Sequence, residues 1–344
     1  MKDKIALFTE NSPSLESYWR SIVLFGRNVA SYKFALAKSL LEIAPMGQSE
    51  ITLEMLAEPF AKHICEHIRV APKQATSNSS KFLEACTKFN NNEVTYDELI
   101  STTVALGFNN VIDAFHIVNN HELPKRFYVK DYSSNGKRII LTDEVFKMVG
   151  HSDLCNLNAE AESRWKLVET AWELGVNRNL LNVKYDNDLE CLFIDERLRR
   201  KDVTSIRGAL NGYQKGKCFY CFDDIVVDGD DNDCDVDHFI PHSLQKFVGD
   251  VNLDGVWNLV LSCQNCNRGS NGKFANLPSL KYLERLHNRN EFLISSHHPL
   301  RETIINQTGK TEEERIAFLN NIWNRAKEIL IHTWETKNIG EEVF

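Results

Sequence analysis

The first third of the chain has the apolar spacing of α-helices. Apolar residues recur mostly at three- and four-residue steps between Leu15 and Leu41, which predicts one long helix that ends before Pro45. A second helix is predicted over residues 52–68, with a kink at Pro59. Beyond a polar connector, shorter helices are predicted over residues 80–89, 95–106 and 110–118.

The pattern changes to strands beyond Pro124. Two β-rich runs, 126–132 and 137–141, flank a Ser-Ser-Asn-Gly sequence, which is a hairpin signal, and the runs 180–185 and 189–194 are consistent with a second hairpin. Helices are predicted again near Asp143, over 159–174, from Pro278 to about residue 288, and from the capping box at Thr311 to about residue 333. The predicted fold class is α+β and mainly α-helical.

Length and composition indicate a folded protein with more than one domain. The chain has 344 residues, of which 42% are hydrophobic and 26% charged, and this composition excludes a disordered or low-complexity protein. No apolar run is long enough to span a membrane, and no apolar signal-peptide core follows Met1, so we expect a cytoplasmic protein. The predicted segments are a helical region over 1–122, an α+β connecting region with hairpins over 123–204, a module with candidate chemistry over 205–275 and a helical region over 276–344.

The net charge of −8 argues against a protein that coats itself with nucleic acid. Nucleic-acid binding therefore requires a local basic patch. The segment from Arg197 to Lys217 holds seven basic residues against one acidic residue, Asp202. This run is a candidate phosphate-binding surface, and a solvated helix face is the alternative.

Four of the nine cysteines form two Cys-x-x-Cys pairs, Cys218/Cys221 and Cys263/Cys266. Cysteines of a cytoplasmic chain are mostly reduced, and four thiolates in two such pairs suit a tetrahedral zinc ion. A shell of four thiolates leaves no position for water, so the predicted zinc is structural. The 41 residues between the pairs are too many for a minimal zinc ribbon and must hold a folded insert.

This insert carries the candidate chemistry. It contains Asp237-His238-Phe-Ile-Pro241 and Asn258, and Asn267 follows Cys266 directly. The ordered combination of Cys-x-x-Cys, Asp-His-x-x-Pro, Asn and Cys-x-x-Cys-Asn resembles the HNH endonucleases of the ββα-metal group over roughly residues 205–275. The resemblance implies two antiparallel strands followed by a helix, arranged round one catalytic cation.

The resemblance also implies a role for each motif residue. His238 would be the general base that deprotonates the attacking water, and Asn258 would orient the loop and the His238 backbone. Asp237 and Asn267 would hold a catalytic Mg²⁺ or Mn²⁺ ion. The physical chemistry agrees, because an imidazole accepts protons near neutral pH and a hard cation prefers oxygen ligands.

Two local features depart from the ideal pattern. Asp237 and His238 would point to opposite faces of a regular strand, so the strand must twist or end there. The two glycines that follow Asn267 predict a short, late or broken helix.

Candidate nucleic-acid contacts are Arg207, Lys215, Lys217, Arg268 and Lys273.

The sequence therefore predicts a metal-dependent HNH endonuclease that hydrolyses phosphodiester bonds, most naturally of DNA. RNA as the substrate and a nicking variant stay open, as do a homodimer or a partner protein. An effector role in bacterial defence is a hypothesis that rests only on the large helical regions round the module. The alternative from a different class is a non-catalytic, zinc-stabilised scaffold that binds nucleic acid or protein.

Overall fold

The chain folds into two compact units. The computed structural model describes residues 14–25, 30–76, 80–118, 121–133, 136–151, 153–174, 181–196, 199–228, 233–249, 251–296, 298–337 and 339–344. Unit 1 covers Met1–Leu157 and unit 2 covers Asn158–Phe344. The fold is α+β and about 54% helical, which confirms the predicted class. Within the described ranges, no helix is both long and apolar enough to cross a membrane. The division into four segments stays a prediction.

The helices of unit 1 follow local sequence signals closely. Thr52, Ser80 and Thr95 each accept a hydrogen bond from a backbone amide of the first helical turn, as N-cap residues do. Buried apolar residues then follow at helical spacing. The helices are α2 (Leu15–Phe25), α3 (Tyr32–Ile43), α4 (Leu53–Val70), α5 (Lys81–Asn90), α6 (Tyr96–Thr102), α7 (Val111–Ala114) and α8 (Asp143–His151), with a 3₁₀ turn η1 (Ala44–Met46) and a π-helical segment η2 (Thr103–Gly107).

Two helix predictions in unit 1 were wrong in extent. The single helix predicted from Leu15 to Leu41 is two helices, α2 and α3. Between them the backbone makes tertiary contacts instead, because Ala30 bridges Ala75 and the Ser31 amide donates to the Gln74 carbonyl at 3.0 Å. The helix predicted over 110–118 is only the short α7, which is followed by strand β2 (Ile117–Val118) paired with β3 (His121–Glu122).

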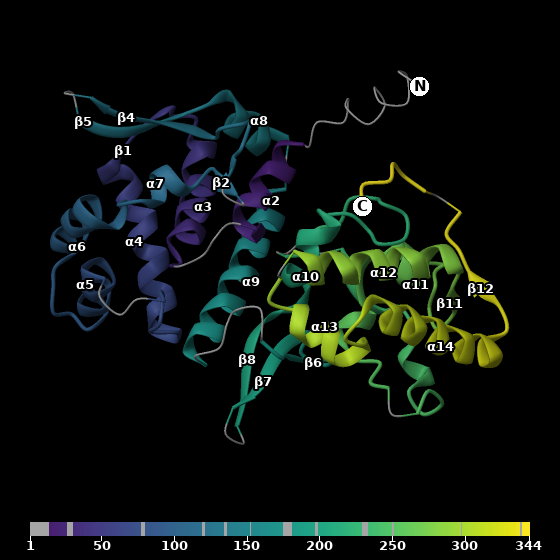
Figure 1. Cartoon of the computed structure of the whole chain (residues 1–344). Coiled ribbons are helices and arrows are strands. Elements are labelled where there is room, and N and C mark those ends of the chain that lie inside the picture. The colour runs from purple at the N-terminus through teal and green to yellow at the C-terminus, as the bar shows by residue number, and fades with distance from the viewer. Residues whose placement is uncertain are drawn as a thin grey trace. The chain divides into compact units, whose positions relative to one another are not determined.

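A three-stranded antiparallel sheet completes unit 1. The predicted hairpin is confirmed as β4 (Tyr128–Ser133) and β5 (Gly136–Leu141), and β1 (Glu50–Thr52) adds to the other edge of β5. Figure 1 shows this sheet lying across one end of the α3–α4 pair. Residues 134 and 135 of the predicted turn lie outside the described residues.

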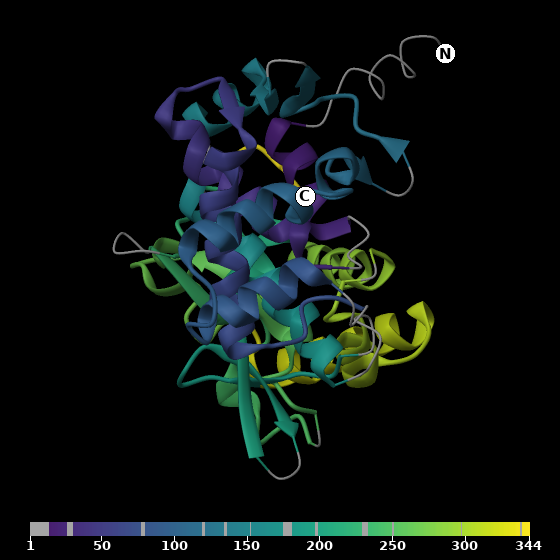
Figure 2. The ribbon, with the colours of Figure 1, turned by 90° about the vertical axis from the view of Figure 1, so that its left-hand side faces the viewer.

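Unit 2 contains the second predicted hairpin, with an adjoining third strand that was not predicted. β6 (Lys184–Asp186) pairs with β7 (Cys191–Glu196), which confirms the hairpin, and β8 (Arg199–Ser205) pairs with the other edge of β7. The basic run therefore begins in a strand, not on a helix face, and Arg197 lies outside the described residues. Figures 1 and 2 both show the teal β7–β8 ribbon running out from the body of unit 2.

Helices enclose most of unit 2. The last of them opens with a complete capping box between Thr311 and Glu314, as predicted, and ends three residues early. The helix from Pro278 begins at Leu280 and is longer than predicted, and α13 was not predicted. The helices are α9 (Leu154–Glu173), in which the unit boundary falls, α10 (Ile206–Gln214), α12 (Leu280–Ser295), α13 (Arg301–Thr308) and α14 (Glu312–Leu330).

A strand pair and a short helix lie among these helices. β9 (Cys234–His238) and β10 (Leu259–Cys263) are antiparallel, with His238 opposite Leu259 and Cys234 opposite Cys263. α11 (Gln264–Arg268) follows β10 directly. Short 3₁₀ turns η4 (His242–Leu244) and η5 (Val256–Asn258) lie between the strands, and β11 (Leu277–Pro278) pairs in parallel with β12 (Thr333–Trp334).

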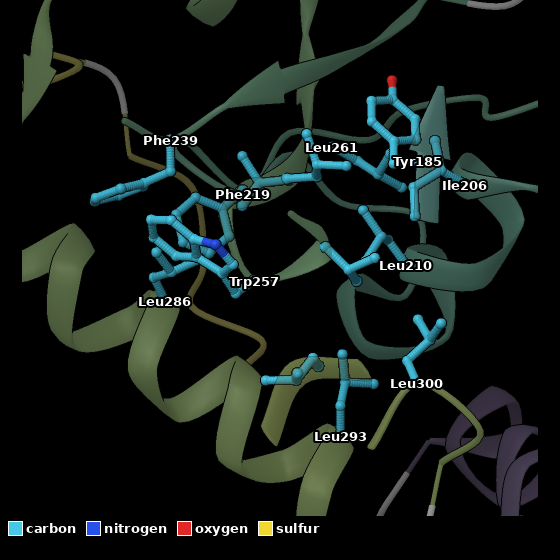
Figure 3. Packing of buried hydrophobic residues seen from close by; sticks show 14 of the residues in the cluster. Tyr185, Ile206, Leu210, Phe219, Phe239, Trp257, Leu261, Leu286, Leu293 and Leu300 are labelled. Carbon is cyan, nitrogen blue, oxygen red and sulfur yellow. The ribbon is translucent and has the colours of Figure 1, made fainter. Parts of the chain in front are cut away.

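The core of unit 2 surrounds this strand pair. Figure 3 shows Phe219, Phe239, Trp257 and Leu286 at one end of the core in this view, and Leu261 nearer Tyr185, Ile206 and Leu210. Phe219, Trp257 and Leu261 are almost completely buried, so burial of apolar side chains holds the loops before and between the strands against the helices. The insert is thereby fixed in place.

Candidate functional site

The four paired cysteines come together at one place in unit 2. Their Sγ atoms all lie within 4.8 Å of one another, all four residues are buried, and each is a free cysteine. Cys221 Sγ and Cys263 Sγ are 3.7 Å apart. Among the described residues this is the one group of three or more cysteine, histidine or acidic side chains that could hold a metal ion. The cluster could therefore bind a structural metal such as zinc, as predicted.

Each Cys-x-x-Cys pair lies on a turn whose amides face a sulfur. The Tyr220 amide donates to Cys218 Sγ and the Cys266 amide donates to Cys263 Sγ, both at 3.4 Å. Such donors favour a thiolate. Burial alone acts in the other direction and raises the pKa of the Cys218 thiol well above its usual value. A cation among the four sulfurs is the charge that would stabilise thiolates in so buried a place.

Gln214 at the end of α10 joins the two cysteine pairs. Its Nε2 donates to the carbonyls of Leu261 (2.8 Å) and Lys217 (2.9 Å), and its Oε1 accepts from the Leu261 amide at 2.9 Å. The Phe219 amide also donates to the Leu261 carbonyl, at 2.9 Å. The turn that carries Cys218 is thus fixed to β10. No sequence motif marks Gln214, because its partners are backbone groups and one of them, Leu261, is 47 residues away in the chain.

His238 is the last residue of β9, and its ring contacts a carboxylate from the following loop. Nε2 lies 2.8 Å from Asp254 Oδ1, and the His238 side chain is only 10% exposed. Nε2 of His242 lies 3.5 Å from the same oxygen. Burial lowers the pKa of His238, although Asp254 opposes this shift, so the neutral imidazole is favoured. Asp254 was not among the predicted site residues, because an isolated loop aspartate has no recognisable spacing.

Asn258 is fully buried and clamps the backbone on both sides of the site. Its Oδ1 accepts from the Ile240 amide at 2.8 Å, while its Nδ2 donates to the carbonyls of Ile240 (3.0 Å) and Leu253 (2.9 Å). Its own carbonyl accepts from the Phe239 amide at 2.8 Å. These bonds lie just after His238 and just before Asp254. The geometry therefore agrees with an orienting role for Asn258.

Asp237 lies beside His238 but is bound to a buried lysine. Its Oδ1 accepts from Lys273 Nζ at 2.9 Å, and its Oδ2 accepts from the Tyr220 hydroxyl at 2.6 Å. Lys273 also donates to the carbonyls of His238 (2.9 Å) and Phe274 (3.2 Å). Lys273 is a predicted nucleic-acid contact, but its side chain is only 1% exposed. In this arrangement it anchors Asp237 and does not present its charge to a phosphate.

Asn267 lies in α11, which is short, as the neighbouring glycines predicted. Its Nδ2 donates to Asp235 Oδ2 at 3.0 Å, and Arg268 Nε lies 3.0 Å from the same oxygen. Asp235 and Asp237 lie two residues apart on β9 and therefore on the same face of the strand. The structure thus brings Asn267 onto the acidic face of β9, where its side chain donates to Asp235. Among the described residues it makes no hydrogen bond to Asp237.

The other residues predicted to contact nucleic acid are mostly bound to other groups of the chain. Arg207 pairs with Glu190 (Nε–Oε2 2.7 Å) and donates to the Cys234 carbonyl. It therefore supports the start of β9. Lys215 Nζ donates to the Val343 carbonyl at 3.1 Å. Lys217 lies 2.7 Å from Asp224, which is 89% exposed. The side chain of Arg268 is 58% exposed, which makes it the most accessible of the five predicted residues.

The donor atoms fit the two predicted metals to different degrees. The four thiols suit zinc in kind, number and separation. Asp237 and Asn267 offer the oxygen atoms that a hard cation prefers, but Lys273 and Tyr220 already bind the Asp237 carboxylate, so only its remaining lone pairs could serve a cation.

Comparison of the chain with protein-family models, curated proteins and solved structures gave no match.

Proposed function

We propose that unit 2 carries a metal-dependent HNH-type endonuclease that hydrolyses phosphodiester bonds of DNA. One observation carries the proposal. β9 ends on Asp237 and His238, and its antiparallel partner β10 leads directly into α11 with Asn267, so one strand pair and its helix supply an imidazole and two oxygen donors. This strand–strand–helix order is the one that the HNH resemblance implies.

In the proposed reaction, His238 accepts a proton from the attacking water. The water oxygen forms a bond to phosphorus, and the bond to the 3′ oxygen breaks, which leaves 5′ phosphate and 3′ hydroxyl ends. Asp237 and Asn267 would hold Mg²⁺ or Mn²⁺, which when bound neutralises charge on the phosphate and the leaving oxygen. Asn258 holds the backbone beside His238. Arg268, which is exposed beside Asp235, would contact a neighbouring phosphate.

The second candidate is a non-catalytic, zinc-stabilised scaffold for nucleic acid or protein. The buried ion pair between Lys273 and Asp237 favours it, because a scaffold needs no free carboxylate at this position. Both candidates share the four-cysteine site. They differ in whether His238 has a chemical role.

Cleavage of supercoiled plasmid by the purified full chain tests the proposal. Reactions contain EDTA, Mg²⁺ or Mn²⁺, with single-stranded RNA as a second substrate. We expect metal-dependent cleavage of the plasmid, and a loss of about 10²–10⁴-fold in His238→Ala, the range for removal of a general base. His332→Ala, which removes an exposed histidine of unit 2, should cleave like the wild type.

Zinc content is measured on the same samples and should stay near one per chain in every variant. Equal cleavage by wild type and His238→Ala would exclude His238 as the base. A zinc-loaded wild type that cuts neither substrate would favour the scaffold, and RNA cleavage alone would correct the substrate class.

A further inference from the structure

Among the residues that the structure describes, the ring of His238 makes its hydrogen bond through one nitrogen, Nε2. Nε2 lies 2.8 Å from Asp254 Oδ1, while Nδ1 has no hydrogen-bond partner among the residues that the structure describes. An ionised carboxylate can only accept, so the proton of the neutral ring must lie on Nε2. The lone pair then lies on Nδ1, the atom that would have to accept a proton from water.

Asp254 is itself held firmly. Its backbone amide donates to Asn252 Oδ1 at 3.0 Å, and the Asn252 carbonyl accepts from Trp257 Nε1 at 3.2 Å. Gln245 spans the same loop, because its Nε2 donates to the Val251 carbonyl at 2.7 Å and its Oε1 accepts from the Leu253 amide at 2.8 Å. The backbone that carries Asp254 is therefore fixed by hydrogen bonds on both sides.

Asn258 couples this loop to the strand that carries His238. It binds the Leu253 carbonyl, directly before Asp254, and both backbone polar groups of Ile240, two residues after His238. The separation of the two partners is thus set by a fully buried side chain and not by a mobile surface contact. His242, at 51% exposed, shares the carboxylate at the longer distance of 3.5 Å.

We propose that Asp254 is the positioning residue of this site: it holds His238 in the Nε2–H tautomer and orients the ring so that Nδ1 faces the attacking water. The proposal rests on the proposed nuclease function. The resemblance assigns no residue to this role. A carboxylate that orients an imidazole is a general device for fixing which nitrogen carries the proton.

The test measures the tautomer and the kinetics on the same full-length variants. ¹⁵N spectra of histidine-labelled chain report which ring nitrogen of His238 is protonated, and His238→Ala assigns its signals. We expect the Nε2–H form in the wild type and a mixture of forms in Asp254→Ala. The expected loss of kcat in Asp254→Ala is about 10–100-fold, the size found for groups that orient a functional ligand, with KM changed by less than about twofold.

Two variants control for folding and for charge. Asp254→Asn keeps the size of the side chain but can present its amide N–H to Nε2, so it should favour the Nδ1–H tautomer and lower kcat. Asp224→Ala removes an exposed acidic residue of the same unit and should leave tautomer and rate unchanged. Zinc content and melting temperature are compared for all variants, and Asp254→Asn against wild type carries the test if Asp254→Ala does not fold.

The outcomes separate this proposal from the proposed function. An unchanged tautomer and rate in Asp254→Ala would overturn the positioning role while the nuclease stands. If the wild type cleaves no substrate, the nuclease proposal fails, but the ¹⁵N spectra still test the contact between Asp254 and His238. Loss of the Nε2–H preference in Asp254→Ala would then uphold that contact. An unchanged preference for the Nε2–H form would overturn it.

Discussion

At the scale of the residue, burial decides what a charged side chain can do. Lys273 and Lys217 both form ion pairs with aspartates, but the Lys273–Asp237 pair is almost completely buried, whereas Asp224, the partner of Lys217, is 89% exposed. A buried charge that loses its partner keeps the full cost of desolvation, while water replaces a lost partner at the surface. The two lysines are therefore a matched pair for measuring the effect.

We predict that Lys273→Met lowers the free energy of unfolding by about 3–5 kcal/mol, because Asp237 would stay buried without its cation. Lys217→Met should change it by less than about 1 kcal/mol. Urea denaturation of the zinc-loaded chain measures both. The double variant Lys273→Met with Asp237→Asn should recover part of the loss, and equal effects of the two single variants would contradict the buried pair.

At the scale of the element, one glycine permits the contact between α9 and α10. A Cβ atom on Gly208 would lie 2.7 Å from the Ala159 carbonyl oxygen and closer still to Ser163 Oγ. Both groups belong to α9. The close approach places α10, and with it Gln214 and the first cysteine pair, against the rest of unit 2. Gly150 in α8 is the opposite case, because a Cβ there would meet nothing within 4 Å.

The prediction is that Gly208→Ala destabilises the chain by about 1–3 kcal/mol, the usual cost of overpacking. Gly150→Ala should instead stabilise it by up to about 1 kcal/mol, because alanine is the better helix former. Thermal and urea unfolding of the two variants test the pair. Stabilisation by Gly208→Ala would mean that α9 and α10 are less tightly packed than the structure shows.

At the scale of the whole molecule, the four-cysteine site joins parts of unit 2 that are far apart in the chain. Cys218 and Cys221 follow α10. Cys263 is the last residue of β10, and Cys266 lies within α11. Metal binding at such a site is coupled to folding. The apparent free energy of binding is typically about 10–16 kcal/mol for structural zinc. Unit 1 has no part in this cluster.

Removal of the metal should therefore act on unit 2 first. We expect that a strong chelator, or Cys263→Ser, raises amide hydrogen exchange in β9, β10 and α11 and leaves unit 1 largely protected. Cys155→Ser, at an exposed cysteine, serves as the control. Hydrogen exchange read by mass spectrometry checks this, and unchanged exchange in unit 2 after complete zinc loss would show that the metal does not hold the module.

The candidate site was predictable in its residue types and less so in its contacts. The ordered motif around His238 and the four cysteines could be recognised because each piece is short. The structure then places Lys273 on Asp237 instead of at the surface, and Asn267 on Asp235. These pairings join positions more than 30 residues apart in the chain, so no local sequence pattern predicts them.

The sequence by itself determined the helix starts near Thr52 and Thr95, the capping box at Thr311, both hairpins and each Cys-x-x-Cys turn, because these depend on interactions within a few residues. Only the tertiary structure decided that the first predicted helix breaks near Ala30, where the backbone pairs with residues 74 and 75 instead. It alone placed Asp254 against His238 through the Asn258 clamp. Such contacts arise when burial of apolar side chains brings distant segments together and leaves their polar groups to find partners inside the core.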